Sequence, residues 1–223
     1  MNFYFFNDPI ETSITKLKIQ GIGQKEIYHS IMNTKLLVMP FINENQELCF
    51  KSQHICGLED WIQRHKSKSN NNNDFREHIL HMIASLSSQI QYFEKRGLSF
   101  LGFNLQDIIV VDDNCFFFAN NKYLISFAAK KIKIMIPIVK PMFSSPELIS
   151  LVQLPATVSH DCCYYSLGAI VVFLLLDVYL LKGNEIKTEK EIEHILKPIV
   201  LTKMYWFLKR CFHKQGQRIL LYI

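Results

Sequence analysis

The sequence predicts an α+β fold with segregated elements, because apolar strand-like runs occupy its first part and helical periodicity dominates the remainder. Of its 223 residues, 49% are hydrophobic and 20% are charged, which excludes general disorder. The 8 glycines and 7 prolines also exclude collagen-like and proline-rich architectures. A chain of this length can bury one sizeable core or two small ones.

Residues 1–65 form the small first part of the predicted fold. Its expected elements are a helix end, a buried strand, a turn, a returning strand and a short helix, at residues 27–32, 36–42, 43–45, 48–50 and 57–62. The polar, low-complexity stretch at 66–73 predicts an exposed loop, which separates this part from residues 74–223.

The second part begins with a long predicted helix. Asp74 is a good N-cap, Glu77 completes a capping box, and apolar residues then recur with helical spacing until Gly97. A second capping box, Thr188 with Glu191, indicates another helix start. The other expected elements are a hairpin strand, a turn, the second hairpin strand, an apolar helix and a last helix, at residues 108–111, 112–114, 115–118, 166–181 and 204–212. We therefore expect this part to be mostly helical and to hold one hairpin.

Charge and cysteine usage limit the function classes. The net charge of +5 is far from the dense basic stripe of a nucleic-acid binder, so we expect no nucleic-acid partner. The six cysteines form no C-x-x-C pair, which predicts a reduced, cytoplasmic protein. The run His160, Asp161, Cys162 and Cys163 lacks a second ligand pair at zinc spacing, so we expect no metal site there. The apolar run at 164–181 is short for a membrane span and contains Asp177, which favours a buried helix and no membrane contact.

Five features stand in an order and spacing that resemble the protein kinase fold. They are a helix end, a catalytic loop with its strand, an A-P-E-like triplet, a W-S-x-G-like helix start and a late arginine, at residues 92–98, 100–111, 145–147 and 165–168 and at Arg218. The resemblance is strongest over residues 74–218, and it implies a reduced strand-containing N-lobe with a mostly helical C-lobe. It implies that the apolar helix is the buried pillar of the large lobe. It also implies a buried, bidentate ion pair between Glu147 and Arg218.

The same resemblance implies that the catalytic chemistry has been lost. It places the H-R-D triplet on Phe100 through Gly102, so that Gly102, which cannot accept a proton, replaces the catalytic aspartate. Asn104 replaces the loop lysine. Asp107 keeps an oxygen ligand at the position of the metal-binding asparagine, whereas Asn120, at the D-F-G aspartate, offers only a neutral carbonyl oxygen.

Features that would bind a nucleotide are also sparse. No G-x-G-x-x-G occurs, and residues 21–23 read G-x-G without a clear strand-turn-strand context. The candidates for a phosphate-binding lysine and its glutamate partner are Lys16, Lys18, Lys35 and Glu26. The helix aspartate that braces the kinase catalytic loop falls on Cys163.

We therefore expect a catalytically degenerate protein kinase-like domain, a pseudokinase, that acts as an interaction or scaffolding module for a protein partner without a cofactor. The alternative is a weak ATP and magnesium binder, or an atypically active Ser/Thr protein kinase, that uses displaced residues such as Asp107, Asp112 or Asp113. A membrane anchor at 164–181 and a cysteine hydrolase are further alternatives. The degenerate pattern and the Asn-rich loop resemble kinase-like proteins of large DNA viruses, which would place the chain in the host cell cytoplasm.

One strip of the sequence has the character of a docking element. Lys130, Lys131, Lys133 and Lys140 are interleaved with apolar residues, and the alternation over 131–136 predicts a half-buried strand. We expect this basic, apolar strip either to dock on a partner or to pair with another chain edge to edge.

Overall fold

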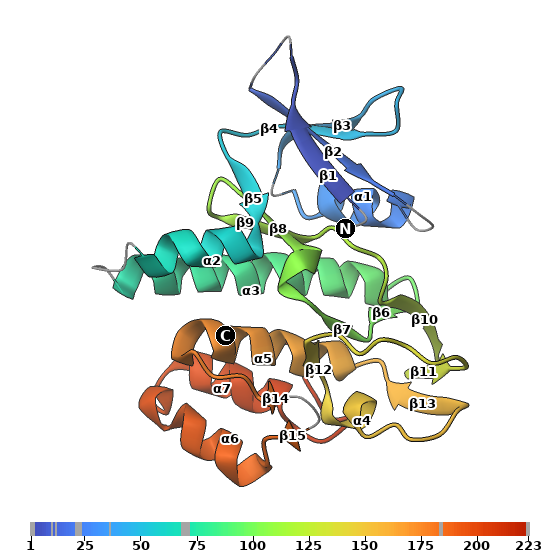
Figure 1. The fold of residues 1–223 in the computed structure, drawn as a ribbon, viewed down its shortest axis with the longest axis vertical. Coiled ribbons are helices and arrows are strands. Elements are labelled where there is room, and N and C mark those ends of the chain that lie inside the picture. Colours follow the sequence, from blue (N-terminus) through green and yellow to red (C-terminus); the bar gives the residue numbers. More distant parts are fainter. Residues whose placement is uncertain are drawn as a thin grey trace. The chain divides into compact units, whose positions relative to one another are not determined.

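Helices and strands gather in two units in the computed structural model, which confirms the α+β class (Figure 1). The structure describes residues 3–9, 11, 13–20, 24–35, 37–67, 72–182 and 185–221. Unit 1 comprises Met1–Lys95 with Leu105–Lys122, and unit 2 comprises Arg96–Asn104 with Tyr123–Ile223. The chain therefore passes between the units after Lys95, after Asn104 and after Lys122.

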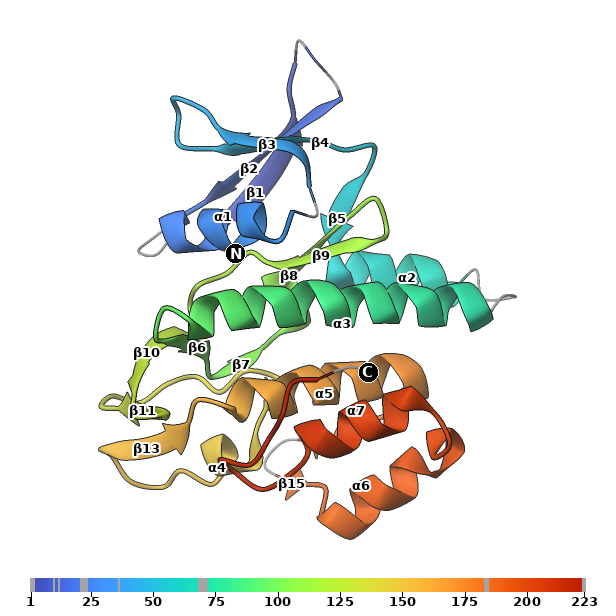
Figure 2. The same ribbon diagram turned by 180° about the vertical axis from the view of Figure 1, so that it is seen from behind.

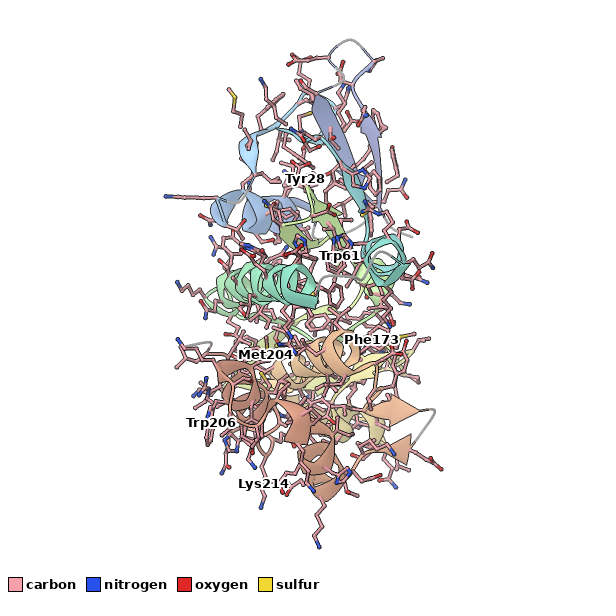
Figure 3. The ribbon with its side chains drawn as sticks, turned by 90° about the vertical axis from the view of Figure 1, so that its left-hand side faces the viewer. Tyr28, Trp61, Phe173, Met204, Trp206 and Lys214 are labelled. Atoms are coloured by element: carbon pink, nitrogen blue, oxygen red, sulfur yellow. The ribbon has the colours of Figure 1, made fainter. Side chains whose placement is uncertain are left out.

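A four-stranded antiparallel sheet forms the first layer of unit 1. Its strands pair in the order β1 (Phe3–Asn7), β2 (Ile14–Ile19), β4 (Leu48–Lys51) and β3 (Val38–Ile42). Helix α1 (Gln24–Asn33) packs against the face that buries Leu17 and Ile19, where the Tyr28 hydroxyl accepts from the Ile19 amide and donates to the Leu17 carbonyl (Figure 3). The helix and the two strands expected in this region are confirmed as α1, β3 and β4. The prediction that the 36–42 run is buried is wrong, because β3 is an edge strand whose Val38, Met39 and Phe41 are exposed.

Two helices and a hairpin form the rest of unit 1. The elements are β5 (Ile55–Gly57), α2 (Leu58–Ser67), α3 (Asn72–Glu94), the 3₁₀ turn η1 (Leu105–Asp107), β8 (Ile108–Val111) and β9 (Cys115–Phe118). The predicted hairpin is confirmed, because β8 and β9 pair antiparallel from Ile108 opposite Phe118 to Val111 opposite Cys115. Gln89 of α3 donates to the Phe118 carbonyl and to Ser30 on α1, and accepts from the Phe118 amide. This buried amide joins both helices to the hairpin.

The segment around residues 66–74 differs from the expectation. Lys66 and Ser67 belong to α2, and α3 begins at Asn72, so Asp74 lies inside the helix and is not its N-cap. Residues 68–71 of the expected loop lie outside the described part of the chain. The helices on either side of this segment share unit 1 because both pack on the same β8–β9 region.

Unit 2 holds more strands than the single hairpin expected for residues 74–223. Four short strands form an antiparallel sheet in the order β13 (Ala156–Ser159), β11 (Lys131–Ile134), β10 (Leu124–Ala128) and β6 (Leu98–Phe100). A second pair joins β7 (Gly102–Phe103) to β12 (Phe143–Ser144), and β14 (Leu181–Lys182) pairs with β15 (Glu185–Ile186). Such short strands carry too few residues for their alternation to be recognised in the sequence.

The helices of unit 2 include one apolar helix, α5. They are α4 (Pro146–Ile149), α5 (Cys162–Leu176), α6 (Glu189–Leu196), the 3₁₀ turn η2 (Lys197–Ile199) and α7 (Lys203–Cys211). Helix α5 packs along α7 and against the short strands of the unit (Figure 2). Every residue of α5 from Cys162 to Leu174 is buried, and Phe173 lies within the unit (Figure 3). Helix α5 is shifted from the expected range of 166–181, because Asp177 adopts a left-handed φ of 55° and ends it. Among the described residues, no helix is both long and apolar enough to cross a membrane.

Candidate functional site

A buried cluster of charged side chains in unit 2 joins α4 to the C-terminal segment, the chain that follows α7. Both terminal nitrogens of Arg218 donate to the carboxylate of Glu147, one of them to Oε2 at 2.9 Å. The side chains of Arg218 and Glu147 are 3% and 13% exposed. The Asp161 carboxylate lies 3.7 Å from the same guanidinium and accepts from the Arg218 amide, while Arg218 Nε donates to the His213 carbonyl. The structure thus brings together the two residues that the kinase resemblance pairs.

The acids around Arg218 favour its charged form. Burial disfavours the charged form of Arg218, but the hydrogen bonds and charges of Glu147 and Asp161 outweigh it and raise the pKa of the guanidinium. Arg218 also lies 5.3 Å from the centre of the Tyr165 ring, and burial raises the pKa of that phenol. Because a buried bidentate pair fixes the geometry of both partners, the cluster is suited to holding α4, α5 and the chain after α7 together.

The position assigned to the catalytic aspartate has no room for a side chain. Gly102 lies in β7, and a Cβ atom there would stand 2.6 Å from the Phe143 carbonyl oxygen and 2.7 Å from Pro141 Cγ. Phe100 is buried in β6. The Asn104 side-chain oxygen accepts a hydrogen bond from the Met142 amide at 2.8 Å. This loop therefore fastens the 141–143 segment of unit 2 and presents no proton acceptor at the position of Gly102.

Cys163 occupies the position of the aspartate that braces the catalytic loop in kinases, and it packs against its neighbours. Cys163 Sγ lies 3.4 Å from the Ser99 hydroxyl and donates to the His160 carbonyl at 3.3 Å, so a thiol stands where the resemblance implies an aspartate.

Asp107 and Asn120 contact each other inside unit 1. The Asn120 amide nitrogen donates to Asp107 Oδ1 at 2.6 Å, and the Asn120 oxygen accepts from the Lys122 amide at 3.0 Å. Asp107 is 5% exposed, and its carbonyl accepts from the Ala119 amide. The pair joins η1 to the segment after β9, with the amide oxygen turned away from the carboxylate. Within the described ranges, no three His, Cys, Asp or Glu side chains gather as a metal site.

The two turn aspartates have structural partners in unit 1. Asp112 and Asp113 adopt left-handed φ values of 50° and 58° in the β8–β9 turn. The carboxylate of Asp112 accepts from the amides of Gln53 and His54, both at 2.8 Å, and Asp113 lies 3.6 Å from Arg64. These contacts give both aspartates a structural role in the hairpin turn.

The candidate phosphate lysines do not meet the candidate glutamate. Lys16 and Lys18 alternate in β2 with the residues buried against α1, so their side chains lie on the other face of the sheet from α1 and Glu26. Lys16 pairs with Asp8 at 2.5 Å, a hydrogen bond that raises its pKa, and Lys18 lies 3.8 Å from Glu47. Lys35 lies in the turn after α1, and residues 21–23 lie outside the described part of the chain.

A broad hollow of about 1240 Å³ in unit 2 has no counterpart among the features expected from the sequence. Asn104 and the 140–142 segment border it on one side, the end of α5 and Tyr179 on another, and the start of α6 on a third. Met142 and Tyr179 are 46% and 41% exposed there. Its walls come from segments far apart in the chain, and no local pattern marks such a surface.

Comparison with protein-family models finds no matching family, and comparison with curated proteins finds no significant relative. The roles of the residues above therefore follow from their contacts in this fold.

Proposed function

We propose that the chain is a degenerate protein kinase-like domain that has lost catalysis and acts as a protein-interaction module. One observation carries this proposal: no side chain fits at Gly102, while Glu147 and Arg218 form a tight buried pair. Selection that preserves the fold but not catalysis would produce this contrast between the two sites.

Phosphoryl transfer needs a residue that accepts the proton of the attacking hydroxyl and acids that hold magnesium. Gly102 cannot supply the first. Asp107 is buried and bonded to Asn120, whose oxygen points to the Lys122 amide. We therefore expect neither kinase activity nor a bound cofactor.

Binding of a protein segment suits the 1240 Å³ hollow of unit 2. Such a groove with exposed Met142 and Tyr179 has the mixture of aromatic and flexible side chains that interaction surfaces favour. All six cysteines are free, which fits a reducing compartment such as the cytoplasm.

Weak nucleotide binding is the second candidate function. The contact between Asp107 and Asn120 favours it, because one acid and one amide occupy the two positions that the resemblance assigns to metal ligands. A cation at this point would require the Asn120 amide to turn over.

A thermal-shift measurement with and without Mg·ATP separates the two candidates. A ligand at 100 times its Kd adds about 2.7 kcal/mol, which raises Tm by roughly 5–10 °C for a chain of this size. We expect no such rise, and no autophosphorylation with labelled ATP. A rise of several degrees that Asp107→Asn abolishes, each protein being compared with its own ligand-free Tm, would establish nucleotide binding and overturn the first candidate.

A further inference from the structure

Positive charge is concentrated in one stretch of the chain. Residues 114–160 contain five lysines and one acid, Glu147, and so carry four of the five net positive charges. The carboxylate of Glu147 is already paired with Arg218. The lysines of this stretch therefore have little opposing charge nearby in the sequence.

Three of these lysines project from the sheet of unit 2. Lys131 and Lys133 are exposed on β11 while Ile132 and Ile134 are buried, as the sequence alternation predicts. Lys130 is exposed in the turn before β11. In the described part of the chain, these three side chains form no hydrogen bond or ion pair. Their charge is therefore available to a partner.

Exposed aliphatic side chains continue from the same strand. Ile136 and Val139 after β11 are 69% and 72% exposed, and Val152 before β13 is 93% exposed. We call the set the basic aliphatic surface; its members are Lys130, Lys131, Lys133, Met135, Ile136, Val139, Val152 and Leu154. Strands β11 and β13 lie at the end of unit 2 away from α6 and α7 (Figures 1 and 2).

A small apolar hollow opens beside the aliphatic members of this surface, on the face of β11 that carries Ile134 and not the face that carries Lys131 and Lys133. It measures about 230 Å³, and its walls come from Ile136 and Ile138 on one segment and from Leu151, Val152 and Leu154 on another. Ligand pockets for whole small molecules usually start at about 300 Å³. The hollow therefore suits one apolar side chain.

We propose that the basic aliphatic surface binds an acidic segment of a partner protein. Carboxylates of that segment pair with Lys130, Lys131 and Lys133 on one face of β11, and one apolar side chain further along the segment, past the end of β11, enters the hollow. The inference rests on the proposed function as an interaction module, and it names the chemistry of the partner. Strand β11 pairs with β13 from Lys131 to Ile134 and with β10 at Lys131 and Ile132, so edge-to-edge pairing is blocked at the start of β11 and docking uses side chains.

An anionic membrane surface is the competing occupant. Interfacial membrane sites are rich in Trp, Tyr and Phe, whereas the exposed apolar members of this surface are Met, Ile, Val and Leu. A concave hollow is also matched better by a protruding side chain than by a lipid layer. Both observations favour the peptide.

The test uses fluorescence anisotropy with the full chain and labelled synthetic peptides in which glutamates flank Leu, Ile, Met or Phe. Peptides with Gln in place of Glu are the controls. We expect at least one acidic peptide to bind, its Gln counterpart to bind about tenfold more weakly or worse, and high salt to weaken the complex.

Two pairs of charge reversals locate the site. Lys131→Glu with Lys133→Glu should weaken binding by about tenfold or more. The matched control is Lys190→Glu with Lys203→Glu, two exposed lysines elsewhere in unit 2, which changes net charge equally and should retain binding. Val152→Ser with Ile136→Ser should weaken binding without changing net charge. Circular dichroism checks that each variant keeps its fold.

Three results would overturn the inference: no acidic peptide binds, both charge-reversal pairs act equally, or phosphatidylserine vesicles bind while the peptides do not. If no acidic peptide binds and Mg·ATP does not raise Tm, the proposed role of this surface is refuted but the proposed interaction module is not. Peptide binding together with a Mg·ATP shift refutes the loss of nucleotide binding and supports this surface.

Discussion

Arg218 is the residue on which the charge cluster of unit 2 depends. Its guanidinium contacts Glu147 and Asp161, and its side chain is almost inaccessible to water. Removing one partner of a buried ion pair leaves a desolvated charge, which costs more than the pair itself contributes. Asp161 stays beside Arg218 when Glu147 is removed, so part of the charge remains compensated.

Glu147→Ala should therefore lower the free energy of unfolding by about 3 kcal/mol, at the low end of the range for broken buried pairs. This corresponds to a fall in Tm of roughly 6–12 °C for a chain of this size, measured by thermal circular dichroism. Glu193→Ala is the control, because Glu193 pairs with Lys209 at an exposed position and its removal should change Tm little. Equal effects of the two substitutions would contradict a structural role for the cluster.

Gly102 gives a second prediction at the residue scale. Gly102→Ala should destabilise the fold by about 2 kcal/mol, because the added methyl group meets the Phe143 carbonyl and Pro141 at less than contact distance. Gly57→Ala is the matched control, since its Cβ would approach no described atom closer than Asp60 Oδ2 at 3.9 Å. Urea denaturation measures both. A Gly102→Ala variant as stable as Gly57→Ala would show that the site has room for a side chain.

The capping box of α6 shows how strongly a local motif determines an element. Thr188 Oγ1 accepts from the Glu191 amide, and Glu191 accepts from the Thr188 amide, as the spacing of the two residues predicts. These backbone and side-chain hydrogen bonds, with the one from Lys187, lower the pKa of Glu191 to about 2. A carboxyl group whose pKa is lower in the folded state stabilises the fold above its unfolded pKa of about 4.3, and this contribution is lost as the pH falls through the folded value.

Glu191→Ala should thus lower Tm at pH 6, and the difference from the wild-type chain should shrink below about pH 4.3 and vanish near pH 2. Differential scanning calorimetry over this pH range measures the difference. Glu189→Ala, in the same first turn of α6 but outside the capping box, is the control. A difference that persists unchanged at pH 2 would contradict the cap.

Elements with local signals were the ones that the sequence could predict. The β8–β9 hairpin, the alternation of β11 and the cap of α6 each depend on residues within one short segment. The β10–β11 hairpin has no such signal, because its turn places Ala129 and Lys130 at φ values of 48° and 62°, where Gly or Asn is usual. The pairing of β10 with β6 and of β11 with β13 holds the two strands that this turn connects, and these partners lie far away in the sequence.

At the scale of the whole molecule, surfaces built from distant segments escaped prediction. Glu147 and Arg218 could be paired in advance only through a family resemblance, whereas the hollow at Met142 and Tyr179 has no sequence signature. The division into units was hidden for the same reason. Residues 105–122 complete unit 1 although residues 96–104 before them belong to unit 2.

This topology predicts which fragments fold. A fragment of residues 1–95 lacks β8 and β9, so β5 loses its strand partner and Gln89 loses both hydrogen bonds to Phe118. Three buried phenylalanines, Phe116 to Phe118, are also missing from its core. Such a fragment should resemble a molten globule, with helical circular dichroism, poor NMR dispersion and no cooperative melt.

A fragment of residues 1–122 restores all of these contacts and should unfold cooperatively, even though it carries the short 96–104 segment without the rest of unit 2. Thermal circular dichroism and amide NMR spectra of the two fragments make the comparison. The substitution Gln89→Leu in the longer fragment should lower its Tm, because the buried backbone N–H and C=O of Phe118 then lose their hydrogen-bond partner. A cooperative melt from residues 1–95 would show that unit 1 is complete without the hairpin.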